Sequence, residues 1–244
     1  MKTLSTLSFI DEVGRGPLAG PVVACCISLH LNGSTLNSNN VSNQKKQILK
    51  KFDLFLANLG VNDSKKLFPL KRQDILKSLS IRPLDCFQLN GGQIIEFENL
   101  RMQVTIAQRE APYIEKHNIL EATFDAMNES FQRSYFSDEL DNRIVFVDGN
   151  KTPQNNEIFI PIIKGDQLLS PIALASIVAK EYRDLLMKKW DEIYPHFNFF
   201  KHSGYGTKYH LEKIKTHGPS PIHRRTFRGV KEYFGENSEK RNIK

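Results

Sequence analysis

Residues 9–24 read FIDEVGRGPLAGPVVA, in which two adjacent carboxylates interrupt an apolar run. Asp11 and Glu12 are followed by a loop with three glycines and two prolines, and a second apolar run then covers 21–29. Apolar and β-branched residues favour strands, whereas glycine and proline favour turns. The stretch therefore predicts a hairpin-like antiparallel strand pair over 7–10 and 21–29, joined by a conformationally permissive loop.

The composition is that of an ordinary globular protein, because 40% of the 244 residues are hydrophobic and 25% are charged. No apolar run approaches the roughly 18–20 residues of a membrane-spanning helix. The N-terminus also has no signal-peptide pattern, so we expect a cytoplasmic protein without a membrane partner. The odd set of Cys25, Cys26 and Cys86 predicts buried thiols instead of a disulfide framework or a zinc site.

The positive charge is concentrated at one end of the chain. The net charge is +7, and residues 201–244 contain 11 Lys and Arg against 4 Asp and Glu. A one-sided basic block favours a polyanionic partner, most simply nucleic acid. A solvated basic surface that keeps the protein in solution is an equally good explanation, and charge alone does not separate the two.

The remaining segments alternate between strand and helix patterns. Further strands are expected over 84–90, 143–149 and 158–166, and helices over 46–58, 62–79, 117–133 and 170–193. Ser170 and Pro171 are suited to the cap and first turn of the last helix. The alternation predicts an α/β domain over 1–195 and a helical, basic C-terminal region over 196–244.

Carboxylates occur where three of these strands end: at Asp11 and Glu12, at Asp148, and at Asp166. Any one of them could be a simple turn or cap residue. Several carboxylates that converge would repel one another, and a divalent cation removes that conflict. Oxygen ligands without a Cys or His cluster favour Mg²⁺ or Mn²⁺ over zinc. The set thus predicts a metal-dependent site of the kind that nucleases use.

Seven blocks together resemble type 2 ribonuclease H, the bacterial ribonuclease HII. They are DEVGRGPLAGPVVA at 11–24, NDSKKL at 62–67, VDGN at 147–150, KGD at 164–166, ASIVAKEYRD at 175–184, GYGTKYH at 204–210 and GPSPIHRRTF at 218–227. The resemblance implies an RNase H-like α/β fold with a central mixed five-stranded sheet and a helical C-terminal appendage. It also implies cleavage of the RNA strand of RNA–DNA hybrids, and incision on the 5′ side of ribonucleotides embedded in duplex DNA.

The resemblance also assigns site residues. It implies that Asp11, Glu12, Asp148 and Asp166 are catalytic and bind two divalent ions, Mn²⁺ or Mg²⁺, in a two-metal reaction that leaves 3′-hydroxyl and 5′-phosphate ends. The remaining implied contacts are with substrate. Gly14, Arg15 and Gly16 would recognise the ribose 2′-hydroxyl, Tyr205 would pack on the sugar of the following nucleotide, and Lys65, Arg224 and Arg225 would contact phosphates.

Two features depart from the family pattern. Residues 31–60 form a longer segment than is usual, which we interpret as an insertion, and Leu168 stands where many relatives have a basic residue. Asp63 and Asp184 are expected to be a helix cap and a structural residue. We expect a monomer, and the tail contains no evident peptide for a sliding-clamp partner.

Two alternative functions are compatible with part of this pattern. One is a non-catalytic protein that binds hybrids, which four intact acids argue against. The other is an enzyme of the same fold that cuts long hybrids but not single ribonucleotides, which the glycine loop and Tyr205 argue against.

Overall fold

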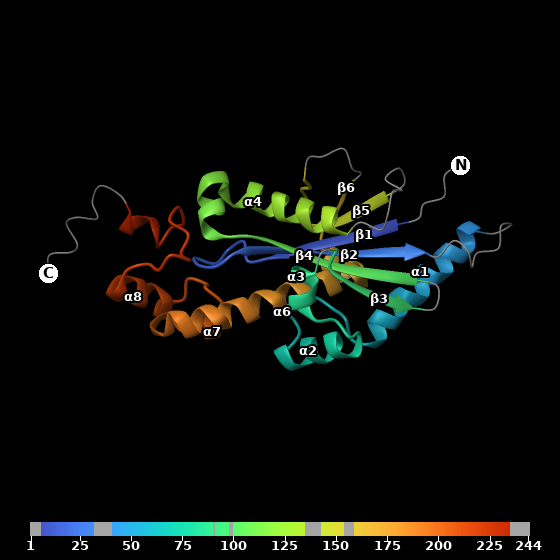
Figure 1. Cartoon of the computed structure of the whole chain (residues 1–244), viewed down its shortest axis with the longest axis horizontal. Helices are drawn as coiled ribbons and strands as arrows, with labels where there is room; N and C mark the ends of the chain where they lie inside the picture. The colour runs from blue at the N-terminus through green and yellow to red at the C-terminus, as the bar shows by residue number, and fades with distance from the viewer. Residues whose placement is uncertain are drawn as a thin grey trace.

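The computed structural model describes residues 6–31, 41–89, 91–97, 100–134, 143–153 and 159–234, and a mixed sheet lies at its centre (Figure 1). In these residues the sheet has six strands in the order β3-β4-β2-β1-β5-β6. Their bounds are Thr6–Val13 (β1), Val22–Leu31 (β2), Gln93–Phe97 (β3), Leu100–Arg109 (β4), Arg143–Asp148 (β5) and Phe159–Ile162 (β6). The first strand of the chain is therefore central, antiparallel to β2 and parallel to β5.

The hairpin predicted from the opening stretch is present. Strands β1 and β2 pair in register, with Asp11 opposite Cys25. Strand β1 continues to Val13, so both acids lie inside the strand and not after it. The two strands are almost wholly buried, and all three cysteines are buried free thiols, as expected.

Helices cover both faces of the sheet (Figure 1). The helix α4 (Ala111–Arg133) packs on one face. The other face is covered by α6 (Ser170–Ile193), with α1 (Val41–Asn58), α2 (Pro69–Ser78) and α3 (Pro83–Gln88) packed against it. Of these described helices, none is long and apolar enough to cross a membrane. The predicted α/β arrangement is confirmed, with six strands in place of five.

The strand predicted over 84–90 is wrong. Residues Pro83–Gln88 form helix α3, because the proline fixes a helical φ in the first turn and leaves no unsatisfied amide there. After α3 the chain returns to the sheet and forms the antiparallel hairpin of β3 and β4. This hairpin was not predicted, and it supplies the additional strand.

Several helix starts also differ from the predictions. Helix α1 begins at Val41 and not at 46, and α2 begins at Pro69 and not at 62. Asp63 caps a turn, not a helix: its Oδ1 accepts from the amide of Lys65 at 3.0 Å. Helix α4 begins at Ala111 and is interrupted at Asn118, whose Oδ1 caps the second segment close to the predicted start.

Helix α6 ends at Ile193 as predicted, but its cap differs. Leu169 is the capping residue, and Ser170 is already helical, with its amide donating to Asp53 Oδ1 at 3.2 Å. The serine hydroxyl is therefore not the cap, although Pro171 does lie in the first turn.

The C-terminal region adds short helices beyond α6. These are η3 (Pro195–Phe197), α7 (Phe199–His202), α8 (Lys208–His217) and η4 (Lys231–Tyr233). A hydrophobic cluster joins this region to the β1–β2 loop and α6, with members Leu18, Ala19, Met187, Phe197, Phe199, Ile214, Ile222 and Val230. The division at 195/196 stays a prediction. Part of the predicted insertion, residues 32–40, lies outside the described residues.

Candidate active site

The central pairing of the sheet places the predicted acids beside one another. Ile10 of β1 pairs with Val147 of β5, so Asp11 and Asp148 follow directly on two adjacent parallel strands. The carboxyl ends of parallel strands meet at one edge, where sites of α/β folds form. Asp11 is only 5% exposed, and the Glu12 side chain beside it is 14% exposed.

Asp166 reaches the same edge by a different route than predicted. It lies not at the end of β6 but in the short helix α5 (Gly165–Leu168), which follows Lys164 in a left-handed conformation. The backbone amide of Asp166 donates to Asp148 Oδ1 at 3.4 Å. The turn between β6 and α5 therefore brings the two predicted acids together.

The protonation behaviour of three of the acids reflects this crowding. Burial raises the pKa of Asp11 well above its usual range, and the charges of Glu12 and Asp148 raise it further. Burial also raises the pKa of Glu12, with Asp148 adding to the rise while Arg15 opposes it. The pKa of Asp166 is raised by burial and then by Asp148. Asp148 is thus the shared neighbour of the other three acids.

Two cations lie close to this acidic edge. Arg15 Nη1 donates to Glu12 Oε1 at 3.4 Å. The charge of Lys65 lowers the pKa of Glu12 and of Asp166, against the larger effect of burial. Lys65 is exposed, so its ammonium group stands in solvent beside the acids. The structure therefore brings this predicted phosphate contact to the site.

The donor chemistry of the edge fits a hard divalent cation. All four side chains are carboxylates, the ligands that Mg²⁺ and Mn²⁺ prefer, and their mutual repulsion is the conflict that such a cation relieves. As placed, no three His, Cys, Asp or Glu side chains of the described residues meet closely enough to hold a metal ion. The acids are neighbours at one edge of the sheet.

A cleft of about 280 Å³ opens beside the acids. Its lining includes Glu12, Arg15, Asp148 and Lys151 on one side, and apolar side chains of α4 such as Phe124 on the other. Sequence reasoning missed Lys151, although its position three residues after Asp148 was a usable signal. The cleft leaves this edge of the sheet accessible to a ligand.

The β1–β2 loop lies next to this edge and contacts the C-terminal region. Gly14 has φ +93°, a conformation that favours glycine, and a methyl group there would overlap Arg183 Nε. A methyl group on Gly16 would lie 3.6 Å from Tyr205 Cε1. Tyr205 is 44% exposed, so its ring stands in solvent directly beside Gly16. Residues 189 positions apart are thus joined into one surface.

The two predicted tail arginines are separated by the structure. Arg225 is exposed, with Nε 3.9 Å from a Glu115 carboxylate oxygen and its guanidinium over the Phe234 ring. Arg224 is fully buried and donates to backbone carbonyls of the β1–β2 loop. Arg225 is therefore available for a phosphate contact, whereas Arg224 lies behind the loop, away from the surface where the predicted contact would form.

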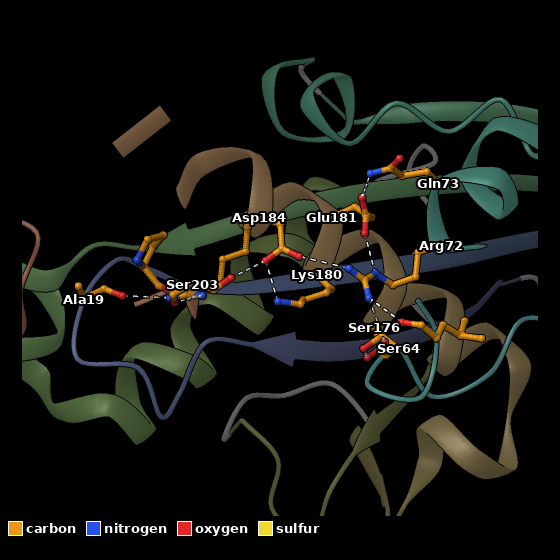
Figure 2. Close-up of polar contacts among 12 residues, drawn as sticks. Ala19, Ser64, Arg72, Gln73, Ser176, Lys180, Glu181, Asp184 and Ser203 are labelled. Carbon is orange, nitrogen blue, oxygen red and sulfur yellow. Dashed lines mark hydrogen bonds and ion pairs between the residues drawn. The ribbon is translucent and has the colours of Figure 1, made fainter. Parts of the chain in front are cut away.

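Polar side chains of α6 make a series of contacts that includes Ser64, Arg72 and Ser203 (Figure 2). Ser176 lowers the pKa of Asp11 against the larger effect of burial, and its hydroxyl lies 2.8 Å from the Ser64 hydroxyl. Asp184 accepts from Lys180 at 2.6 Å and from Ser203 Oγ at 3.0 Å, in keeping with its predicted structural role. Sequence reasoning missed Ser176 and Arg183, although both stand in the block 175–184.

Comparisons with known proteins agree with one another. The family model described as Ribonuclease HII matches residues 10–230. The Chlamydia pneumoniae Ribonuclease HII is 38% identical over 231 residues, which cover 93% of this chain and 86% of that protein. The ribonuclease H2 structure from Pyrococcus horikoshii OT3 superposes with a TM-score of 0.60 at 20% identity, covering 98% of this chain and all of that one.

A further solved structure is a Bst-RNase HIII in complex with Mn²⁺, with a TM-score of 0.50 and 14% identity. It covers 95% of this chain and 70% of its own. At these identities, the likeness to solved structures shows the fold, and it confirms the expected RNase H-like class.

Proposed function

The chain belongs to the ribonuclease HII family, and from this premise we propose that it incises duplex DNA on the 5′ side of single embedded ribonucleotides. Membership makes the protein a metal-dependent endoribonuclease that acts on RNA–DNA hybrids. The proposal concerns the finer substrate, the roles of individual residues, and the number and kind of metal ions.

One observation carries the proposal, namely the contact between the β1–β2 loop and Tyr205 beside the acidic edge. Gly16 follows Glu12 by four residues, and Tyr205 lies against it. A backbone that carries no side chain can approach a ribose closely, and a 2′-hydroxyl both donates and accepts hydrogen bonds. The loop and the ring together could therefore examine two consecutive sugars next to the site of hydrolysis.

In this proposal Asp11, Glu12, Asp148 and Asp166 hold two divalent ions, Mn²⁺ or Mg²⁺. Bound ions of this kind activate water and stabilise charge on a departing oxygen. The Mn²⁺ complex of the structurally similar ribonuclease HIII supports the choice of ion class. Hydrolysis on the 5′ side of the ribonucleotide is expected to leave 3′-hydroxyl and 5′-phosphate ends.

The remaining residues hold the substrate. Gly14, Arg15 and Gly16 recognise the 2′-hydroxyl, while Tyr205 packs on the sugar of the next nucleotide. Lys65 and Arg225 contact phosphates in this proposal, which their exposure supports. Such contacts position the duplex without reading its sequence, so we expect little dependence on the bases around the ribonucleotide.

The test uses duplex DNA that holds one ribonucleotide in an otherwise deoxyribose strand. With Mg²⁺ or Mn²⁺ present, we expect a single cut on the 5′ side of that ribonucleotide, and none without metal. An all-DNA duplex of the same sequence is the control. A protein that binds the substrate but leaves it intact in both metals would contradict the catalytic proposal.

A long RNA–DNA hybrid, assayed in parallel, separates the alternatives. An enzyme that cuts only long hybrids would leave the single-ribonucleotide substrate intact while degrading the hybrid. A non-catalytic binding protein would cut neither. Cleavage of both substrates is the result that the loop and Tyr205 lead us to expect.

A further inference from the structure

Two arginines of this protein are fully buried and point at the same loop. Arg183 of α6 and Arg224 of the C-terminal region are both 0% exposed. Burial of a charged group is costly unless hydrogen bonds compensate for the lost water. Arg72, which is also buried, meets that cost with the carboxylates of Glu181 and Asp184. The other two arginines instead donate to backbone carbonyls.

Arg224 holds both ends of the β1–β2 loop, residues 14–21. Its Nη1 donates to the Arg15 carbonyl at 2.9 Å, and its Nη2 donates to the Gly14 carbonyl at 2.5 Å. Nε and Nη2 also donate to the Gly20 carbonyl at 3.0 and 2.8 Å. Its own amide donates to the Leu18 carbonyl at 2.8 Å. One residue thus ties the first, second, fifth and seventh positions of the loop together.

Arg183 of α6 also donates hydrogen bonds to the β1–β2 loop. Its Nε donates to the Pro21 carbonyl at 3.0 Å, and its Nη2 donates to the Ala19 carbonyl at 3.0 Å. The contact is close, because a methyl group on Gly14 would overlap Arg183 Nε. Its Nη1 donates to the Ser203 carbonyl at 2.8 Å, two residues before Tyr205. Arg183 thereby holds the loop and the segment of Tyr205 in one place.

These contacts determine how the loop faces the substrate. The carbonyls of residues 14, 15, 18, 19, 20 and 21 are engaged from inside the protein, so the orientation of their peptide planes is set. The network continues through Ser203 and Asp184 of α6 to Arg72 of α2 (Figure 2). The loop is therefore anchored to the helix that packs behind Asp11.

We propose that Arg183 and Arg224 are positioning residues that set the selectivity for ribonucleotides by holding residues 14–21 against Tyr205. The inference rests on the proposed function, because it assigns recognition to this loop. Neither arginine needs to touch substrate. A planar guanidinium that donates in several fixed directions suits this role, and a lysine ammonium does not reproduce it.

The test compares Arg183→Lys and Arg224→Lys with wild type on two substrates. One is duplex DNA with a single ribonucleotide, and the other is a continuous RNA–DNA hybrid. We expect kcat/KM on the single ribonucleotide to fall about tenfold or more, because several buried hydrogen bonds are lost. Every nucleotide of the RNA strand in the hybrid has a 2′-hydroxyl, so the protein need not select one position. We therefore expect kcat/KM on the hybrid to fall much less than on the single ribonucleotide.

The ratio of the two activities is the readout, since a loss of stability alone would lower both together. Ile75→Val is the matched control, because Ile75 is a buried core residue of α2 outside the loop. It should lower the melting temperature and leave the ratio unchanged. Parallel loss on both substrates by the lysine variants, or no loss, would overturn the inference.

The two proposals fail in distinguishable ways. If the wild-type protein does not cut the single-ribonucleotide substrate, the proposed function is wrong. If wild type cuts it and the folded lysine variants retain the wild-type ratio, only the positioning role is wrong. If neither variant folds while Ile75→Val does, the arginines serve the stability of the chain and the positioning role is again rejected.

Discussion

Asp148 is the acid on which the candidate site depends most. It ends β5, it accepts the amide of Asp166, and its charge raises the pKa of Asp11, Glu12 and Asp166 alongside the larger effect of burial. The raised pKa values reflect burial and mutual repulsion, which disfavour the charged carboxylates and which a bound cation would offset. Removal of one carboxylate should therefore disturb metal binding far more than folding.

We expect Asp148→Asn to lower cleavage by at least about 10²–10³-fold, because an amide is a weak ligand for a hard cation. Binding of the duplex, measured by fluorescence anisotropy without metal, should stay within about threefold of wild type, since the phosphate contacts remain. Asp74→Asn, at an exposed position of α2, serves as the control. Cleavage by Asp148→Asn at the wild-type rate would remove Asp148 from the catalytic set.

Tyr205 offers the second prediction at this scale. Stacking of one aromatic ring on a nucleotide contributes roughly 1–3 kcal/mol. We therefore expect Tyr205→Ala to lower kcat/KM on the single-ribonucleotide duplex about tenfold, whereas Tyr205→Phe keeps most of the activity. Tyr209→Ala is a close control, because Tyr209 is 42% exposed on neighbouring α8. Full activity of Tyr205→Ala would exclude the ring from recognition.

At the scale of the element, α6 does two tasks. Its apolar side packs on β1 and β2, and its polar residues contact Ser64 and the β1–β2 loop. The contact between α6 and α2 is an ion pair, in which Arg72 Nε lies 2.6 Å from Glu181 Oε1. Both side chains are over 90% buried. Loss of one partner would leave the other charge in a dry interface.

We expect Arg72→Ala to lower the free energy of unfolding by about 3–5 kcal/mol, because Glu181 then loses its buried partner. Urea denaturation monitored by circular dichroism measures this change. Lys66→Ala is the control, since the Lys66 side chain is exposed and its 3.9 Å contact with Asp63 should contribute less than about 1 kcal/mol. If Arg72→Ala lowered the free energy of unfolding no more than the control does, the structural role of the pair would be contradicted.

At the scale of the whole molecule, a buried histidine pair links the two halves of the C-terminal region. His210 Nε2 lies 2.9 Å from His223 Nε2, and one of them must donate. His210 Nδ1 faces the Tyr205 carbonyl, and His223 Nδ1 accepts from the Ser220 amide. Burial lowers the pKa of His210 to about 4 and that of His223 to about 3. His223 immediately precedes Arg224, so the pair helps to hold the loop support.

The sign of the pH dependence follows from these values. His210 has a lower pKa in the folded protein, about 4, than in the unfolded chain, near 6.5. Its contribution to stability is therefore complete above pH 6.5 and is lost as the pH falls toward about 4. We expect the protein to lose on the order of 2–4 kcal/mol between pH 7.5 and pH 5. The measurement is urea denaturation at both pH values, compared with His210→Phe. An unchanged pH dependence in that variant would rule out the pair as its source.

Much of the architecture and the set of candidate acids were predictable from the sequence. The β1–β2 hairpin follows from two apolar runs around a glycine loop, and β5 follows from a short apolar run before Asp148. Prediction from local patterns failed where the same pattern is compatible with both a strand and a helix. The apolar residues over 84–90 suit a strand or a buried helix, and only Pro83 and the packing of α3 against β4 and α6 decide for the helix.

The sequence by itself determined the chemical types: four carboxylates, a glycine loop, a basic tail and the family blocks that connect them. Only the tertiary structure decided which of these groups face solvent. Arg224 and Arg225 are adjacent and identical in type, yet one is buried under the loop and the other is exposed. The reason is that burial depends on contacts between distant segments, here positions 14–21, 183 and 224, and no local pattern records them.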